Sequence, residues 1–342
     1  MNVSQWLLDG DPAIRWQVLR DLVGAPAEKV ARERGRVACE GWGARLLDRQ
    51  EADGSWAGGA YAPRGYDWPE QATGQPWTAT AHTLALLRDL GVDPADERVA
   101  WAVELVRDNV KWEEGGQDFF AGEVEPCVNG LTVSVGVYFG IDVSGIVERL
   151  LRDRLADGGW NCWAPTTASF ASTVNVLEGL LAYERATGVA IAERRAAEEY
   201  LLERGLFRRK RTGDVADSAW LEFSFPARWH YDVLRALEYF RTTAEPPDPR
   251  VSEALDIVRS KRSPDGTWPL ENTHPGDAHF HLEGPDGAPS RWNTLRALRV
   301  LGWAAGQSSG SEPVTGARAS CRAGPIAQQV AVPAATWVRP AS

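Results

Sequence analysis

Two side chains with acid–base chemistry stand close together in the stretch from Arg228 to Leu237. His230 exchanges a proton near neutral pH, and the carboxylate of Asp232 follows two residues later. His230 and Asp232 are therefore the candidate catalytic groups if the protein is an enzyme. Arg228 and its counterpart Arg291 are candidates to bind a diphosphate, although the simpler expectation is an ion pair with a carboxylate of a neighbouring helix.

The same stretch recurs elsewhere in the chain in shorter form. Residues 291–298 repeat it near the end, and residues 15–22 repeat it more faintly near the start. In each copy a tryptophan marks the beginning of a helix, and leucines follow at helical spacing. Three copies predict a fold that is built by repetition.

A second repeated pattern is an Asp-Gly pair that is followed by a tryptophan. It ends at Trp56, Trp160 and Trp268, which are 104 and 108 residues apart. The Asp-Gly pair favours a tight turn with a positive φ at glycine. We expect each tryptophan to pack its turn against neighbouring helix ends. Each interval is close to two repeat units of about 52 residues.

Apolar helices alternate with charged amphipathic helices along residues 1–304. The apolar helices are expected to begin near Ile14, Trp77, Cys127, Ser169, Trp229 and Trp292. The charged helices are expected at residues 27–50, 98–110, 142–155, 190–204 and 249–262. Because six helix pairs can close a ring, we predict an all-α fold, a single α/α toroid of about six inner and six outer helices. Residues 305–342 lack this periodicity and are predicted to be a disordered tail.

The composition restricts the kind of partner. The chain carries a formal net charge of −10, which argues against nucleic acid, since a surface that binds nucleic acid is basic. No apolar run approaches the ~20 residues that a transmembrane helix needs. The four cysteines are scattered without a CxxC pair, so we expect reduced thiols and a cytoplasmic protein. Sixteen tryptophans indicate a recurring structural device or an aromatic-lined cavity.

The Asp-Gly-x-Trp turns resemble the tryptophan-bearing repeats of squalene–hopene cyclases, other terpenoid cyclases and the β subunits of protein prenyltransferases. The resemblance covers residues 1–304, and Gln50 matches a glutamine of the family repeat, although Trp160 and Trp268 lack one. It implies a central cavity for a small apolar, isoprenoid-type ligand, in which aromatic faces stabilise a carbocation. The residues that it implies at this cavity are Trp16, Trp77, Glu125, Tyr138, Phe170, Trp229, Tyr231, Trp292 and Asn293.

The acid motif of squalene–hopene cyclases is incomplete in this chain. The similar segment runs from Asp214 to Asp217, and Ala216 stands where the family has the central acid that protonates an alkene. Alanine cannot supply a proton, so standard hopene cyclisation is not expected. Asp214 and Asp217 are expected to be solvated loop residues.

The protein prenyltransferases imply a different chemistry. They bind zinc through an Asp-x-Cys pair and a histidine, and Glu125, Cys127 and His230 are the similar residues here. Three protein ligands would leave one position open on the zinc to activate a thiol. Three functions therefore remain open: a terpenoid cyclase-like enzyme, a zinc-dependent prenyltransferase-like protein and a non-catalytic toroid that binds its ligand. A carbohydrate-processing enzyme ranks behind them, because Glu125 and Asp232 are the only evident carboxylate pair for it.

Overall fold

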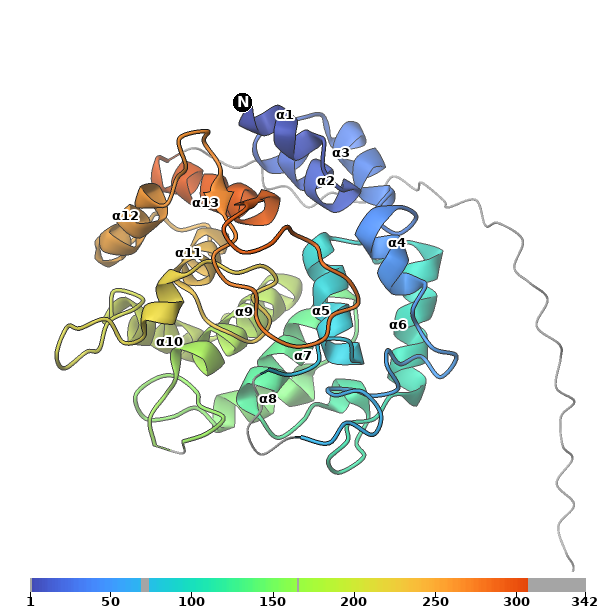
Figure 1. Ribbon diagram of the computed structural model, residues 1–342. Coiled ribbons are helices and arrows are strands. Elements are labelled where there is room, and N and C mark those ends of the chain that lie inside the picture. The colour runs from blue at the N-terminus through green and yellow to red at the C-terminus, as the bar shows by residue number, and fades with distance from the viewer. Residues whose placement is uncertain (1, 69–73, 165, 307–342) are drawn as a thin grey trace, which may run out of the picture.

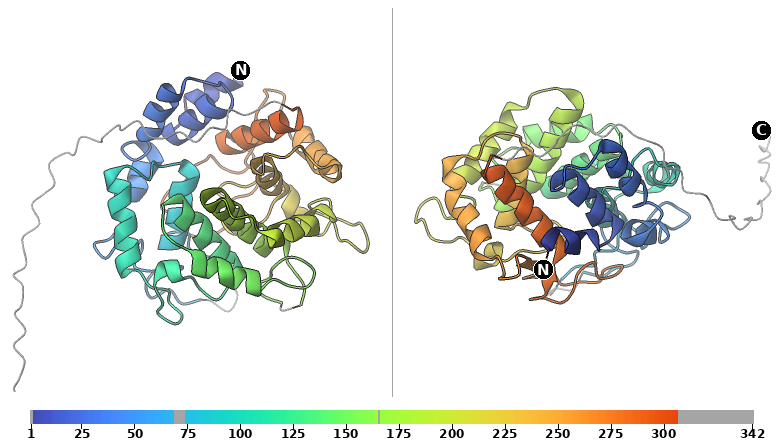
Figure 2. Two further views of the ribbon diagram at one scale, coloured as in Figure 1. Left: turned by 180° about the vertical axis from the view of Figure 1, so that it is seen from behind. Right: turned by 90° about the horizontal axis from the view of Figure 1, so that it is seen from above.

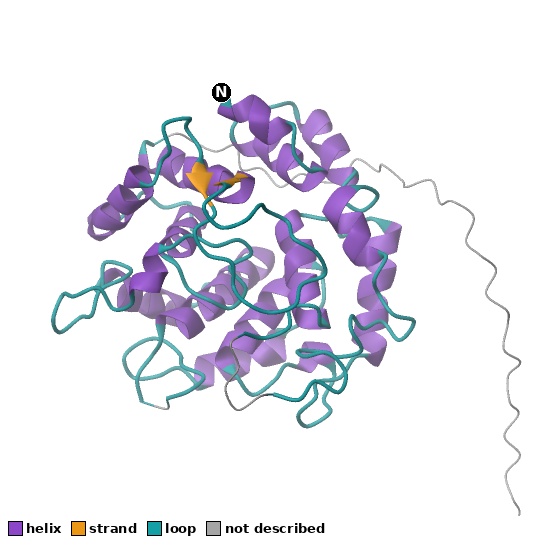
Figure 3. Ribbon diagram, viewed as in Figure 1, coloured by secondary structure: helices purple, strands orange, loops and turns teal. Residues whose placement is uncertain are grey.

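The computed structural model describes residues 2–68, 74–164 and 166–306. This part of the chain contains thirteen α-helices and two strands of two residues each, β1 (Trp268–Pro269) and β2 (Pro289–Ser290). Figure 3 shows the helices in purple, joined by long loops. The expectation of an all-α fold is confirmed.

One set of helices lies around a common centre, and most of the others lie outside this set (Figure 1; Figure 2, left). The inner helices are α2 (Pro12–Asp21), α5 (Thr80–Leu90), α7 (Pro126–Tyr138), α9 (Phe170–Thr187), α11 (Val233–Thr242) and α13 (Arg291–Ala304). The outer helices are α3 (Ala27–Gly35), α4 (Gly41–Leu47), α6 (Glu97–Asn109), α8 (Ser144–Arg152), α10 (Ala192–Leu202) and α12 (Ser252–Ser260). The short helix α1 (Val3–Leu8) precedes α2, and 3-10 turns lie at Phe119–Ala121, Ser218–Leu221 and Pro249–Val251.

Contacts between the inner helices form a closed circuit. Helix α5 contacts α7, α7 contacts α9, α9 contacts α11, α11 contacts α13, and α13 contacts α2. Two hydrogen bonds join α2 to α5: the Trp16 indole N–H donates to the Leu90 carbonyl oxygen at 3.0 Å, and the Gln17 amide donates to the Asp89 carbonyl oxygen at 3.0 Å. The inner helices therefore enclose a common interior.

The three Asp-Gly-x-Trp turns have the same geometry. Their glycines Gly54, Gly158 and Gly266 have φ values of +88°, +103° and +93°. Each tryptophan is fully buried, and its indole N–H donates to a carbonyl oxygen ten residues earlier in an outer helix, namely Leu46, Leu150 and Val258, at 2.8, 2.8 and 2.7 Å. Each tryptophan backbone N–H donates to a threonine of an inner helix, namely Thr80, Thr173 and Thr294, at 3.1, 3.2 and 2.9 Å. Each turn thus ties an outer helix to an inner helix, as expected.

Two glycines allow helices α7 and α9 to lie against each other. A Cβ atom added to Gly130 would lie 2.5 Å from the Asn175 carbonyl oxygen, and one added to Gly179 would lie 2.5 Å from the Gly130 carbonyl oxygen. Both distances are shorter than any side chain tolerates, so only glycine permits this approach. The close contact fixes the start of α7, where Cys127 lies, relative to α9.

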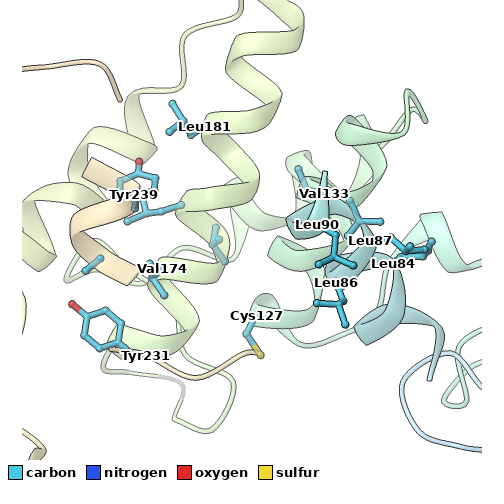
Figure 4. Packing of buried hydrophobic residues seen from close by; sticks show 14 of the residues in the cluster. Leu84, Leu86, Leu87, Leu90, Cys127, Val133, Val174, Leu181, Tyr231 and Tyr239 are labelled. Carbon is cyan, nitrogen blue, oxygen red and sulfur yellow. The ribbon is translucent and has the colours of Figure 1, made fainter. Parts of the chain in front are cut away.

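The hydrophobic core fills the spaces between the helices. Figure 4 shows the leucines Leu84, Leu86, Leu87 and Leu90 of α5 gathered beside Val133 of α7. The core contains buried residues of every inner helix, and all of them belong to one continuous cluster. Since one core links all six inner helices, the described part of the chain forms a single packed unit.

Some helix boundaries differ from those expected. The charged segment 27–50 forms two helices instead of one, because the chain turns sharply at Gly41, which has a φ of +63°. A Cβ atom there would lie 2.0 Å from the Asp11 carboxylate, which accepts a hydrogen bond from the Trp42 backbone N–H. Helices α5 and α11 begin three and four residues after Trp77 and Trp229, so these tryptophans lie in the loops that lead into them.

An ion pair between Asp21 and Arg299 helps to hold α13 against α2. Both side chains are more than nine-tenths buried. Burial raises the pKa of Asp21, but Arg299 and then Arg20 outweigh this effect and lower the pKa to about 2. The charged carboxylate therefore stabilises the folded protein.

We expect Asp21→Asn to lower the free energy of unfolding by about 2 kcal/mol at pH 7. Because the folded-state pKa is depressed, this contribution is complete above the unfolded-state pKa of 3.8 and is lost as the pH falls through about 2. Urea unfolding of both proteins in pH steps from 7 to 3 should show a constant difference that shrinks below about pH 4. Asp108→Asn, which changes an exposed carboxylate, is the control and should have no effect. A difference that persists unchanged at pH 3 would contradict the electrostatic explanation.

Helix α13 ends at Ala304. Residues 307–342, and with them most of the predicted tail, lie outside the described residues. Within the described residues, no helix has the length and apolar character needed to cross a membrane.

Candidate functional site

Two cavities lie among the inner helices, and we name them by their lining. The aromatic cavity, of about 660 Å³, lies at the N-terminal ends of α5, α7 and α11. The arginine cavity, of about 410 Å³, lies between all six inner helices, mainly along their middle and C-terminal parts. The resemblance implied one central cavity, whereas these two cavities differ from each other in chemistry.

The aromatic cavity combines aromatic rings with carboxylates. Its aromatic lining consists of Tyr61, Trp68, Trp77, Trp112, Trp163, Trp229 and His230. Its acidic lining consists of Glu113, Glu114, Glu123 and Glu125. No lysine or arginine belongs to the lining that the structure describes. The cavity therefore suits a ligand that is apolar or carries positive charge.

Loop contacts hold the aromatic rings in place. The Trp77 backbone N–H donates to the Asp277 carbonyl oxygen at 2.7 Å, and its indole N–H donates to the Pro275 carbonyl oxygen at 3.1 Å. The Trp229 indole N–H donates to the Gln75 side-chain oxygen at 2.8 Å. Asp277 and Pro275 belong to the β1–β2 loop, drawn in orange, which crosses in front of α5 in Figure 1. This loop therefore forms part of the cavity wall.

His230 is held by stacking instead of hydrogen bonding. Its ring lies between those of Trp229 and His274, with 3.8 Å between ring centres on each side. Burial, then the charges of Arg235 and Arg228, lower the pKa of His230 to about 4. The ring is thus neutral at pH 7, and its nitrogens form no hydrogen bond with the described residues. A neutral imidazole can accept a proton, but it cannot donate one at this pH as an imidazolium ion would.

Glu125 lies in the wall of the aromatic cavity, directly before α7. Burial raises its pKa, and the neighbouring Glu123 carboxylate raises it further. The Glu125 backbone N–H donates to the Glu123 carboxylate at 2.6 Å, which keeps the two acids close together. A carboxyl group with a raised pKa stays protonated to higher pH, as a general acid must.

Glu125, Cys127 and Cys162 form a thiol–carboxylate cluster at one side of the aromatic cavity. Their ligand atoms all lie within 4.8 Å of one another. The two sulfur atoms are 2.7 Å apart, and the Cys127 thiol donates to the Glu125 carboxylate at 3.6 Å. Two sulfurs and one carboxylate oxygen are a donor set that zinc accepts. This cluster shares Glu125 and Cys127 with the expected zinc site but has Cys162 instead of His230.

Cys162 is the cluster member that was not predicted from the sequence. It follows the Trp160 turn, which brings it back to the start of α7, where the Cys127 backbone N–H donates to its sulfur at 3.3 Å. The Ser172 hydroxyl also donates to this sulfur at 3.3 Å. The Cys127 thiol, Ser172 and the Cys127 backbone N–H together lower the pKa of Cys162, although burial opposes them. Its place two residues after a repeated turn was the signal in the sequence.

The expectation of four reduced thiols holds only in part. Cys127 and Cys162 are free thiols. The pKa of the Cys127 thiol is raised by its hydrogen bond with Cys162 and by burial. Cys39 is disulfide-bonded, which corrects the expectation for that residue. Cys321 lies outside the described residues.

Several predicted ligand-binding residues lie away from the aromatic cavity. Trp16, Phe170, Tyr231 and Asn293 are buried in packing between helices and line neither cavity. Tyr138 and Trp292 line the arginine cavity. Trp77, Glu125, Trp229 and His230 remain together in the aromatic cavity. The structure therefore divides the predicted set into a site, a second cavity and the core.

Asp232 is positioned as a helix cap. Its carboxylate accepts a hydrogen bond from the Arg235 backbone N–H at 2.7 Å and lies 3.9 Å from the Arg296 guanidinium. Burial raises its pKa, and it lines neither cavity. The structural role of Asp232 is therefore to cap the start of α11 and to pair with Arg296.

The structure also shows the surroundings of the other charged residues that the sequence singled out. Asp214 and Asp217 are exposed loop residues, as expected. Arg228 and Arg291 form no ion pair with described residues, so the simpler expectation for them is wrong. Arg228 instead lies over the Trp77 ring at 5.2 Å, where burial and the aromatic face replace a carboxylate.

No protein-family model matches the chain, and no curated protein resembles it in sequence. Solved structures with some likeness include a protein from Actinoplanes, 16% identical with a TM-score of 0.43 over 86% of this chain and 90% of that chain. They also include a variant of the type II terpene cyclase MstE from Scytonema in complex with geranylgeranyl dihydroxybenzoate, 15% identical with a TM-score of 0.34 over 83% and 99% of the two chains. Both TM-scores lie below 0.5, so this likeness decides neither family nor ligand.

Proposed function

We propose that the chain is an α/α toroid of the terpenoid cyclase kind that binds an isoprenoid-type ligand in the aromatic cavity and transforms it through a cation. The observation that carries this proposal is the chemistry of the cavity lining. Aromatic faces and carboxylates surround a space of about 660 Å³ whose described wall holds no basic side chain. Such a wall attracts apolar ligands and stabilises positive charge that develops on them.

The proposed proton path uses two residues of this cavity. Glu125, whose pKa is raised by burial, gives its proton to the ligand when it is in its protonated form. The rings of Trp77 and Trp229 stabilise the cation that forms. The neutral ring of His230 then accepts a proton from the cation as a new double bond forms. One proton enters the ligand and one leaves it, so the reaction is an isomerisation.

The test measures binding and conversion separately. Wild-type protein is titrated with geranylgeraniol by calorimetry, and products from polyprenyl alcohols and squalene are then analysed by gas chromatography with mass spectrometry. Glu125→Gln should bind as the wild type does and convert its ligand about 10²–10⁴-fold more slowly. Trp229→Ala should bind about tenfold more weakly, and Trp101→Ala, on an exposed face of α6, is the matched control.

The pH dependence follows from the direction of the Glu125 shift. Since its pKa is raised, the rate should stay high at acidic pH and fall as the pH rises through that pKa. Binding without any conversion would leave the protein as a non-catalytic binding module. Absence of binding for every polyprenyl ligand would refute the proposal.

A second candidate function rests on the thiol–carboxylate cluster. Glu125, Cys127 and Cys162 would hold a zinc ion beside the aromatic cavity, with one coordination position left for a ligand. Zinc bound there would lower the pKa of a thiol or water that takes this position. This candidate corresponds to a prenyltransferase-like protein with a ligand set different from the family pattern.

A further inference from the structure

The arginine cavity concentrates positive charge inside an acidic protein. All six inner helices contribute to its wall. Its charged lining consists of Arg88, Arg185, Arg228, Arg235, Arg241, Arg296 and Arg299 against Asp89, Glu178 and Glu238. The whole chain carries a formal net charge of −10, so this excess of arginine is local. Unlike the aromatic cavity, this cavity presents guanidinium groups.

The carboxylates of the wall already form ion pairs with arginines. Asp89 pairs with Arg88 at 2.7 Å, and Glu178 pairs with Arg235 at 2.7 Å. Glu238 accepts from Arg296 at 2.5 Å. Glu238 also lies 4.0 Å from Arg299. These pairs occupy every carboxylate of the lining and leave three of its arginines without an ion pair.

Three arginines of the wall, Arg185, Arg228 and Arg241, form no ion pair with the described residues. The guanidinium groups of Arg228 and Arg241 form neither an ion pair nor a hydrogen bond with the described residues. Burial lowers the pKa of Arg228 to about 10, which the charge of Asp89 only partly offsets. Arg299 has Asp21 as a partner, yet burial still lowers its pKa to about 10. A guanidinium keeps its charge at pH 7 even so, and it is costly to bury without a counterion.

Orphan hydrogen-bond donors gather at the same place. Within the described residues, three buried side-chain polar atoms lack a partner: Nε of Arg241, Nε1 of Trp292 and Nε of Arg299. All three atoms are donors, and all three residues line the arginine cavity. Buried polar groups normally have partners, so this group of donors indicates an acceptor that the chain itself does not supply.

Helix ends explain only part of the cluster. Arg88, Arg185 and Arg241 lie in the last turns of α5, α9 and α11, where cations favour the helix C-terminus. Arg228 lies in a loop, and Arg299 lies away from the last turn of α13, so the helix dipole does not account for them.

We propose that the arginine cavity is a binding site for a compact oxyanion of the phosphate class. A phosphate offers several acceptor oxygens and about two negative charges, which match the unpaired guanidinium groups and the orphan donors. The anion is either free or the phosphate group of a larger ligand. This site is independent of the function proposed for the aromatic cavity.

Calorimetric titrations test this site with the full chain at constant ionic strength. The probes are inorganic phosphate, inorganic diphosphate and phenyl phosphate, with sodium chloride as the reference salt. Wild-type protein should bind one equivalent of a phosphate probe saturably, and the probe should raise the melting temperature. Tighter binding of phenyl phosphate assigns the site to an organic phosphate, and tighter binding of an inorganic probe assigns it to a free anion.

Variants locate the binding. Arg241→Gln and Arg228→Gln should each weaken binding at least tenfold, whereas Arg211→Gln, which changes an exposed loop arginine, should have no effect. Without anion, Arg241→Gln should melt at the same temperature as the wild type or higher, since it removes a half-buried charge that forms no ion pair. The proposal is overturned if no probe saturates, or if Arg241→Gln and Arg228→Gln bind as tightly as the wild type.

Discussion

Replacing Trp160 with alanine is expected to lower the free energy of unfolding by about 3–5 kcal/mol. The side chain is fully buried, and its removal leaves a cavity between the outer helix α8 and the inner helix α9. It also leaves the Leu150 carbonyl oxygen, which accepts the indole N–H at 2.8 Å, without its partner. The measurement is urea or guanidinium unfolding followed by circular dichroism.

Two further variants separate the contributions. Trp160→Phe keeps most of the buried apolar area but lacks the N–H donor, so we expect a cost of about 1–3 kcal/mol. Trp101→Ala is the matched control, because Trp101 is 62% exposed, and its effect should stay within about 0.5 kcal/mol. A cost below about 1 kcal/mol for Trp160→Ala would show that the turns are not what joins the outer and inner helices.

The second large effect concerns metal content. If the thiol–carboxylate cluster holds zinc, protein purified under reducing conditions should contain close to one zinc ion per chain by elemental analysis. Cys127→Ser and Cys162→Ser should each reduce this content to near zero, since each removes one of three ligands. Two sulfurs on one tetrahedral zinc lie roughly 3.7 Å apart, so the sulfur atoms, now 2.7 Å apart, must separate by about 1 Å when zinc binds.

His230→Ala is the informative control for zinc. The family pattern makes His230 a ligand, whereas the structure puts Cys162 in the cluster and His230 between two aromatic rings. Retention of zinc in His230→Ala and its loss in Cys162→Ser would support the structural ligand set. Absence of zinc from the wild type, even after incubation with zinc under reducing conditions, would end this candidate and leave the aromatic cavity as an apolar-ligand site.

The two cavities give the protein two distinct kinds of ligand chemistry. The aromatic cavity carries carboxylates and lacks basic groups in its described lining, whereas the arginine cavity carries an excess of guanidinium groups. Arg228 connects them, because it lines the arginine cavity and lies over the ring of Trp77 in the aromatic cavity. A substitution of Arg228 therefore changes both cavities, whereas Arg241 lines the arginine cavity alone.

The local repeats were readable from the sequence because each depends on a few neighbouring residues. An Asp-Gly pair favours a turn through the positive φ of glycine, and the tryptophan three residues after each aspartate buries its ring beside that turn. The alternation of apolar and charged helices likewise follows from helical periodicity. These rules predicted the all-α class and the three turns. They also predicted that apolar and charged helices alternate along the chain.

The predicted starts of α5 and α11 were less accurate, because loop contacts decide where these two helices begin. Trp77 and Trp229 read as the first residues of helices, but each indole N–H instead finds a partner in a distant segment, at Pro275 and Gln75. These partners are distant in the sequence, so no pattern of neighbouring residues predicts them. Both tryptophans were nevertheless predicted to belong to one site with Glu125 and His230, and all four residues line the aromatic cavity.

Sequence alone thus determined the helical class, the repeated turns and the types of residue available for chemistry. Tertiary structure decided which of these residues meet. It brought Cys162 to Cys127 across 35 positions, placed Asp232 at a helix cap, and gathered arginines from separate helices around one cavity. The physical reason is that turns and helices are set by interactions between near neighbours, whereas a site is assembled by long-range packing in which each helix buries its own apolar face.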